Sequence, residues 1–292
     1  MDKPIINESP FPVSPVLPEM LDGNTEIQFR CRKGIECWNA CCSNIDISLT
    51  PYDILRLSRR LGLTTSDFLV QYTFPYEIDA SGIAGVKFKP VEGGNACQLM
   101  VPEGCSVYED RPTSCRYYPV ALMSLRRSDE STDRSAYALV KESHCLGHNE
   151  PRPITIEAYR QEQGVDQYDE LGRGWRQLVL KKKSSGPTIG KPSKRSLQLF
   201  FMACYDLDRF REFVRSSPFA EVYALPTEEM QKILGTDTEL MLFAFRFLRQ
   251  VLFGENTITL QSDALEKHLE RRREVEAERA LQAGNDPDKT GQ

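Results

Sequence analysis

The chain has 292 residues, of which 40% are hydrophobic and 27% charged, and this composition excludes collagen-like and wholly disordered proteins. The length allows one large domain or two modest ones. The formal net charge of -5 excludes the general basic surface of a protein that binds nucleic acid over its whole face, so no general nucleic-acid binding is expected.

The first 25 residues are rich in proline and lack hydrophobic periodicity, which predicts an extended arm over residues 1–25. The stretch Met1–Met20 contains acidic residues and five prolines, and it lacks the uninterrupted apolar run of a signal peptide. The longest apolar stretch, Leu240–Phe253, has 14 residues and includes charged ones, too short and too polar to cross a membrane. We therefore expect a cytoplasmic protein with no membrane contact.

Short elements follow the arm. Ile45–Leu49 alternates like a strand, and Thr50 before Pro51 is typical of a helix N-cap, with Gly62 ending that helix and a second helix through Asp67–Tyr72. Between residues 81 and 140, β-prone runs are separated by turn residues. The predicted strands there are Gly85–Lys89, Cys97–Val101, Val120–Leu125 and Ala136–Val140.

Beyond Pro153 the pattern becomes helical. The predicted helices are Thr155–Gln163, Tyr168–Leu180, Ser196–Ser216, Thr227–Leu234 and Asp237–Leu252. The predicted fold class is mainly α with a small irregular β component (α+β), with a cysteine-rich metal-binding domain packed on a C-terminal helical region. Four regions are expected: a Pro-rich arm over 1–25, the cysteine-rich domain over 26–150, the helical region over 151–260, and a charged helix with a frayed tail over 261–292.

The segment Lys181–Arg195 holds six basic residues and no acidic ones. Its first interpretation is a solvated loop. The alternative is a contact with an anion or an acidic protein, because clustered charge guides a partner of opposite sign. An acidic protein partner is therefore a hypothesis that this segment raises.

Cysteine is unusually frequent and unevenly placed, with nine residues of which eight fall between Cys31 and Cys145. Cytoplasmic thiols stay reduced, so this clustering favours metal binding or redox chemistry over disulfides. Four thiolates complete a zinc site or anchor one iron–sulfur cluster, and eight could serve two centres. The alternative is that several are small buried hydrophobic residues. The candidate ligands are Cys31, Cys37, Cys41, Cys42, Cys97, Cys105, Cys115 and Cys145.

The spacing of these cysteines bears on the metal. Adjacent Cys41 and Cys42 point in different directions in most backbone conformations, so they are expected to ligate different atoms or different centres. The paired C-x2-C units of zinc knuckles are missing, and irregular spacing favours iron. Cys204 falls at helical spacing with Phe200 and Leu207, which predicts an apolar stripe outside the site.

Other side chains lie beside the candidate ligands in the sequence. Arg111 and Arg116 are predicted to be cofactor-binding residues that offset thiolate charge, and ordinary solvated arginine is the alternative. His144 and His148 flank Cys145, and whether either is a ligand stays open. Three tyrosines could shield a centre from water or pack in the core: Tyr108, Tyr117 and Tyr118.

One stretch carries a specific resemblance. Cys105–Pro119 contains the signature Arg111-Pro-x-x-Cys115-Arg-x-Tyr-Pro119, and Cys97 and the Cys37-x3-Cys41-Cys42 group precede it. This arrangement resembles the YkgJ-like cysteine cluster family, also described as the CxxCxxCC zinc- or iron-chelating domain, over about Phe29–Cys145. The resemblance implies a chelating role for all eight cysteines. Flagellin lysine N-methylases are similar in carrying such a cluster, which implies a protein-modifying activity.

The leading interpretation is a metal-binding protein that holds one or two cysteine-ligated centres, iron–sulfur first and zinc second, whose downstream reaction the sequence does not identify. One alternative is a modifying enzyme similar to protein lysine N-methylases. The other is a non-catalytic adaptor that zinc stabilises. Because the sequence contains no GxGxxG, Walker A, HExxH or GxSxG motif, no catalytic residue is predicted and enzymatic activity is left open.

Overall fold

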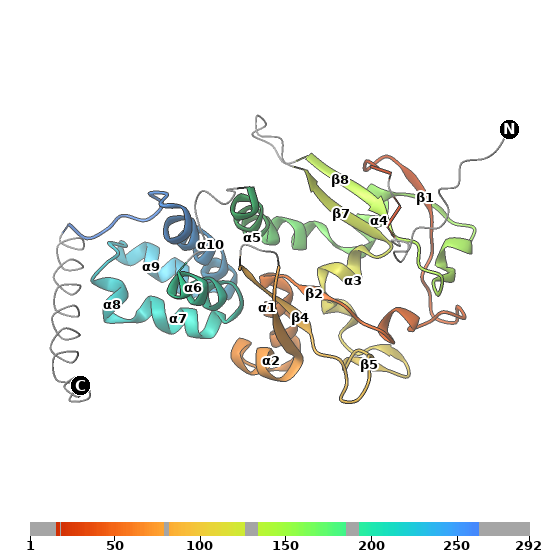
Figure 1. Cartoon of the computed structure of the whole chain (residues 1–292), viewed down its shortest axis with the longest axis horizontal. Coiled ribbons are helices and arrows are strands. Elements are labelled where there is room, and N and C mark those ends of the chain that lie inside the picture. Colours follow the sequence, from red (N-terminus) through yellow and green to blue (C-terminus); the bar gives the residue numbers. More distant parts are fainter. Residues whose placement is uncertain (1–15, 18, 79–81, 126–133, 185–192, 263–292) are drawn as a thin grey trace, which may run out of the picture.

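The computed structural model describes residues 16–17, 19–78, 82–125, 134–184 and 193–262. Most of the predicted arm over 1–25 and nearly all of the predicted charged helix and tail over 261–292 lie outside these residues. Helices α5 to α10 gather at one end of the molecule and the strand-rich part forms the other, with α1 and α2 between them (Figure 1). This arrangement of helices with small sheets confirms the α+β class.

The first helices begin where the sequence places them. Thr50 caps α1 (Pro51–Leu61) by accepting a hydrogen bond from the backbone of Asp53, whose side chain accepts one from the Thr50 backbone in return. Gly62 ends α1 in the left-handed conformation, with φ of 67°. Helix α2 (Thr65–Tyr72) follows at once.

The strands form small antiparallel sheets, all within or beside the cysteine-rich part. They are β1 (Glu26–Gln28) with β9 (Pro153–Thr155), β2 (Ser48–Leu49) with β4 (Ala84–Phe88) and β3 (Thr73–Glu77), β5 (Met100–Val101) with β6 (Gly104–Cys105), and β7 (Val120–Leu125) with β8 (Arg134–Leu139). The predicted strand Cys97–Val101 is reduced to Met100–Val101. Strand β3 was not predicted because Pro75 lies within it, and Pro is confined to the edges of sheets.

Short helical turns separate these strands, and longer helices complete the chain. The short elements are η1 (Ala40–Cys42), η2 (Tyr108–Asp110), α3 (Thr113–Tyr117) and η3 (Leu146–Asn149). The longer part contains α4 (Ile156–Gln163), α5 (Asp166–Ser184), α6 (Lys194–Tyr205), α7 (Leu207–Arg215), α8 (Ser217–Ala220), α9 (Thr227–Gly235) and α10 (Asp237–Phe253).

The predicted continuous helix Ser196–Ser216 is wrong, because the chain breaks at Asp206. That carboxylate accepts a hydrogen bond from Ser66 Oγ at 2.6 Å and caps α7. The predicted loop Lys181–Arg195 is also wrong at both ends, where Lys181–Ser184 and Lys194–Arg195 are helical, and residues 185–192 lie outside the described residues. Lys181 forms an ion pair with Glu255 at 2.5 Å, so it is engaged within the fold.

Two hydrophobic cores hold the elements together. The larger one packs α1, α2 and β4 against α5, α6, α7 and α10, and Cys204 is buried there beside Phe200 and Ala203. The smaller one joins β1, β9, α4 and the β7–β8 hairpin around Phe29 and Ile156. Both cores combine residues from either side of position 150, so the cysteine-rich part is packed directly on the helical region.

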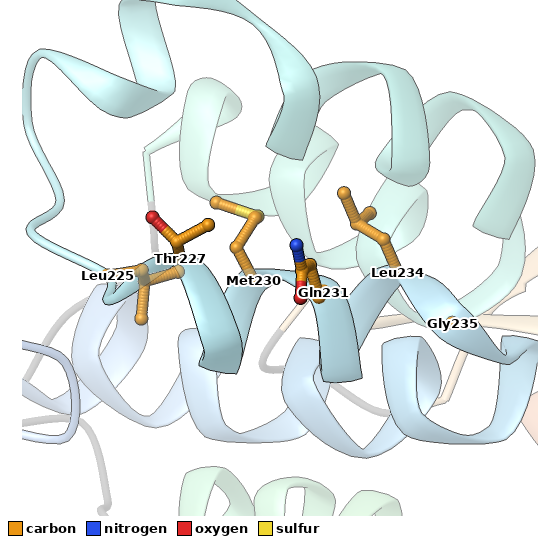
Figure 2. Close-up of a pocket in the computed structure, with 6 residues that line it drawn as sticks. All are labelled: Leu225, Thr227, Met230, Gln231, Leu234 and Gly235. Carbon is orange, nitrogen blue, oxygen red and sulfur yellow. The ribbon is translucent and has the colours of Figure 1, made fainter.

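A groove of about 440 Å³ follows α9, and the side chains at its wall lie along that helix (Figure 2). It is lined by Leu225, Thr227, Met230, Gln231, Leu234 and Gly235. None of these six side chains is ionisable, so the groove offers apolar contact rather than acid, base or thiolate chemistry. Among the described residues, no helix is long and apolar enough to cross a membrane.

Candidate metal centre

One cavity of about 470 Å³ brings together every cysteine that the sequence proposes as a ligand. Its wall includes Cys31, Cys37, Cys41, Cys42, Cys97, Cys105, Cys115 and Cys145. These residues come from the loop before η1, from η1 itself, from the segment between β4 and β5, from β6, from α3 and from the turn before η3. The ninth cysteine, Cys204, is outside the lining and completely enclosed in the larger core.

Hydrogen bonds of the backbone fix the first part of this wall. Asn39 adopts φ of 67°, a left-handed conformation that asparagine tolerates better than most residues, and its carbonyl accepts from Cys42 N at 2.9 Å. The Asn39 side chain also donates to the Val101 carbonyl at 3.4 Å. Cys97 N donates to the Cys42 carbonyl at 2.8 Å. The adjacent cysteines of η1 are therefore held against the segment that leads into the β5–β6 hairpin.

Cys115 is positioned through α1. The Asp53 carboxylate is completely buried, and its Oδ1 accepts from Thr113 N at 2.8 Å and from Thr113 Oγ1 at 2.7 Å. Thr113 is the first residue of α3, so the carboxylate fixes the start of the helical turn that carries Cys115. The capping residue of one helix thus orients a cysteine 62 positions later in the chain.

Cys145 meets Cys37 at the other side of the cavity. Leu146 N donates to Cys37 Sγ at 3.3 Å, and Arg30 N donates to the Gly147 carbonyl at 3.0 Å. Gly147 lies so close to the Phe29 ring that a Cβ there would come within 2.6 Å of a ring carbon. The chain before η1 and the chain at η3 are therefore held together by direct contact.

The thiols are spread around the cavity rather than gathered at one point. Cys41 Sγ and Cys42 Sγ are 4.0 Å apart. Across the described segments of the chain, no three Cys, His, Asp or Glu side chains are close enough together to hold one metal ion. Four thiolates on one zinc, at about 2.3 Å from it, would place their sulfurs about 3.8 Å apart.

The pKa values of Cys41 and Cys42 are driven apart by their contact. The interaction with Cys42 lowers the pKa of Cys41 to about 7, whereas the same interaction, together with burial, raises that of Cys42. Burial and then the neighbouring Cys41, Cys37 and Cys145 raise the pKa of Cys31 to about 11. Cys41 is therefore partly ionised at neutral pH, whereas a cation that binds Cys31 or Cys42 must displace a proton.

The electrostatic neighbours of each thiol indicate two groups. Cys31 and Cys145 both have raised pKa values to which Cys37 and Cys41 contribute, after burial in each case. Burial is also the largest cause for Cys115, and Cys97 and Cys105 contribute there along with Cys41. Cys97 and Cys115 act on Cys42 as well. One group thus surrounds the loop before η1, the other lies between η1, the β5–β6 hairpin and α3, and Cys41 acts on thiols of both.

The two predicted cofactor-binding arginines occupy different places. Arg111 lines the cavity, and its Cζ lies 4.1 Å from the centroid of the Tyr108 ring. Burial raises the pKa values of Cys31 and Cys105, and the positive charge of Arg111 partly offsets that rise. Arg116 is buried outside the lining, where it donates to the Arg111 carbonyl at 3.0 Å and stacks on Tyr168. Arg116 therefore supports the loop that presents Arg111, a role that sequence adjacency to Cys115 does not reveal.

Some of the tyrosine and histidine candidates line the cavity and others do not. Tyr108, Tyr118 and His144 line the cavity, and His144 Nε2 lies 3.6 Å from Glu142, which is also in the wall. His148 is outside the lining and its Nε2 is 3.1 Å from the Val140 carbonyl. Tyr117 is a core residue of the smaller hydrophobic cluster.

Sequence reasoning missed several side chains of the wall, three of which can bear on the chemistry of the site. These are Trp38, Glu142 and Tyr159. Trp38 directly follows Cys37, so its place next to a candidate ligand was the one available signal. Glu142 and Tyr159 reach the cavity only through the packing of η3 and α4, which no local pattern reports.

Comparison with known proteins identifies the class to which this site belongs. Residues 30–169 match the family model CxxCxxCC, described as "Putative zinc- or iron-chelating domain". The resemblance to the CxxCxxCC family seen in the sequence is therefore confirmed over these residues. No curated protein and no solved structure matches the chain.

Proposed function

We propose that this protein holds two cysteine-ligated iron–sulfur centres side by side in one cavity. The observation that carries the proposal is the convergence of eight thiols on that cavity, enough for two sets of four. The first set is Cys31, Cys37, Cys41 and Cys145. The second set is Cys42, Cys97, Cys105 and Cys115.

The doublet Cys41–Cys42 lies at the boundary between the two sets. Their sulfurs are 4.0 Å apart and their pKa values move in opposite directions. Cys42 is joined to Cys97 through the backbone, which favours the second set. Cys41 acts on thiols of both sets, and we assign it to the first because Cys42 completes the second. With this division each set has the four thiolates that an iron–sulfur cluster uses.

Iron is favoured over zinc by the spread of the thiols. Zinc held by four thiolates needs closely spaced sulfurs and no internal space, whereas the cavity has a volume of about 470 Å³. Thiolates are soft ligands that suit iron–sulfur clusters. When bound, such a centre supplies one-electron transfer or a Lewis-acidic iron.

In this proposal the protein's own side chains bind the centres, offset their negative charge and shield them from water. Eight thiolates concentrate negative charge, and Arg111 is the cationic side chain that we propose offsets it, because it already favours the ionised forms of Cys31 and Cys105. The rings of Phe29 and Tyr159 pack edge to face with their centroids 5.8 Å apart, and they form an apolar part of the wall that excludes water.

The test is iron content per folded chain after single replacements. Cys145→Ser removes a ligand of the first set and Cys115→Ser one of the second, so each variant is expected to lose about half of the iron, and the double variant nearly all. Cys204→Ser is the matched control, because this thiol is buried in the larger core away from the cavity. Unchanged iron in both single variants, or equal loss in Cys204→Ser, would overturn the assignment.

A further inference from the structure

Two polar atoms in the cavity wall make no hydrogen bond of regular geometry with the described residues. They are Trp38 Nε1 and Tyr118 Oη, and both atoms are shielded from solvent. Buried donors in native proteins nearly always have an acceptor, and those without one in the protein are often satisfied by a bound group. Two such donors in the wall of one cysteine-lined cavity indicate acceptors inside it.

Trp38 lies beside the second set. A Cβ placed on Gly104 would come within 3.0 Å of the indole Cζ2 and 3.8 Å of Nε1, so the indole packs against the residue that precedes Cys105. Gly104 has φ of 134°, a conformation that glycine adopts readily, and its missing side chain leaves room for the indole. The indole N–H is therefore held next to the β5–β6 hairpin.

Tyr118 lies beside the first set. Its hydroxyl lies close enough to the Cys145 thiol and to the Glu142 carboxylate for both groups to act on it. Its backbone carbonyl accepts a hydrogen bond from Tyr159 Oη at 2.5 Å, and its ring packs edge to face on Phe29 at 6.5 Å. The position of the hydroxyl is therefore fixed by the smaller core.

We propose that Trp38 and Tyr118 are redox-tuning residues, each donating one hydrogen bond to a sulfur of a different centre: Trp38 to the second set and Tyr118 to the first. This inference rests on the proposed iron–sulfur centres. A donor at sulfur stabilises the reduced form, which carries one more negative charge, more than the oxidised form. Each donor therefore raises the reduction potential of its centre.

The test is a reduction potential measured by EPR-monitored titration of the iron-loaded full-length protein. Trp38→Phe and Tyr118→Phe keep an aromatic ring and remove only the donor. Loss of one neutral hydrogen bond is expected to favour the oxidised form about fivefold, which is a shift of about 40 mV to lower potential at 59 mV per tenfold change. Each variant is expected to lower the reduction potential of one centre and to leave that of the other unchanged.

The chain supplies matched controls. Trp175→Phe replaces the other tryptophan, which donates to Tyr205 at 3.1 Å in the helical region, and Tyr117→Phe replaces a tyrosine that donates to Asp169. Neither group lines the cavity. Both control variants are expected to keep the potentials of the unaltered protein. Equal shifts in controls and test variants, or no shift in the test variants, would overturn the tuning role.

A second measurement on unaltered protein avoids any effect of substitution on folding. After labelling with ¹⁵N at the indole nitrogen, pulsed EPR of the reduced centres is expected to show a nitrogen coupling that Trp175→Phe retains, because only Trp38 lies at the cavity. Absence of that coupling in iron-containing protein means that the donor points to water or to no acceptor at all, and overturns the inference for Trp38. Absence of iron and sulfide would instead refute the proposed centres themselves.

Discussion

Replacement of Asp53 by alanine tests whether the cysteine site is built on α1. The carboxylate accepts three hydrogen bonds from groups outside its own residue: Thr50 N at 2.8 Å, Thr113 N at 2.8 Å and Thr113 Oγ1 at 2.7 Å. Asp53→Ala leaves two backbone N–H groups and one hydroxyl without this acceptor, in a place where the side chain is completely buried.

The expected loss follows from those contacts. At about 1.5 kcal/mol for each hydrogen bond to a charged group, the three bonds contribute about 4–5 kcal/mol. Burial opposes this gain, because it makes the ionised carboxylate costly in the folded protein and so raises the pKa of Asp53. A net decrease of about 3 kcal/mol in the free energy of unfolding is therefore expected for Asp53→Ala.

Urea unfolding followed by circular dichroism measures this change, with iron content determined on the same samples. The matched control is Asp67→Ala, because Asp67 occupies the same third position of α2, behind the capping Thr64, but is exposed. Its replacement is expected to cost about 0.5–1 kcal/mol. Asp53→Ala should also lose the iron of the second set, since α3 carries Cys115. Equal destabilisation by the two variants would refute this account of how α1 supports the site.

In metal-free protein, the rate at which Cys41 reacts with iodoacetamide should rise with pH with an apparent pKa of about 7, because the thiolate is the reactive form. The rate for Cys31 should reach its half-maximum only near pH 11. Identical pH profiles for the two residues, measured by mass spectrometry, would contradict this. Gly147→Ala should unfold at lower temperature and lose first-set iron, because the added Cβ meets the Phe29 ring. The control is Gly174→Ala, where a Cβ would lie 2.7 Å from the Phe245 ring. This variant should lower the unfolding temperature without changing iron content. Equal iron loss in both glycine variants would contradict the claim that the contact at Gly147 supports the cysteine site. Removal of iron by chelation should increase hydrogen exchange over residues 31–145, and unchanged exchange would mean that the cysteines serve only as packing residues.

Local signals in the sequence were sufficient for the elements whose ends are capped by their own residues. Thr50, Pro51 and Gly62 define α1 through contacts within a few positions, so the pattern identifies both ends. The break at Asp206 was not predictable, because the carboxylate there is held by Ser66 from a distant segment. Where a cap depends on tertiary contact, periodicity alone joins two helices into one.

The candidate site likewise combines features that the sequence pattern reveals with features that depend on tertiary contacts. Cysteine clustering alone selected the eight residues that the fold brings to one cavity, since few other roles explain so many thiols in a short segment. Arg111 and Arg116 look equivalent in the sequence, but the turn of α3 directs Arg116 into the interior against Tyr168. Trp38 was overlooked because its relevance depends on an unpartnered indole nitrogen, which only the folded structure reveals.

The central claim is that two iron–sulfur centres occupy the cysteine-lined cavity. Its most direct test is the content of iron, acid-labile sulfide and zinc in the full-length protein after anaerobic purification. The account predicts iron and labile sulfide in equal amounts, with about half of both lost in Cys145→Ser and the remainder lost when Cys115→Ser is added. Zinc without sulfide, or a metal content that these replacements leave unchanged, would contradict it.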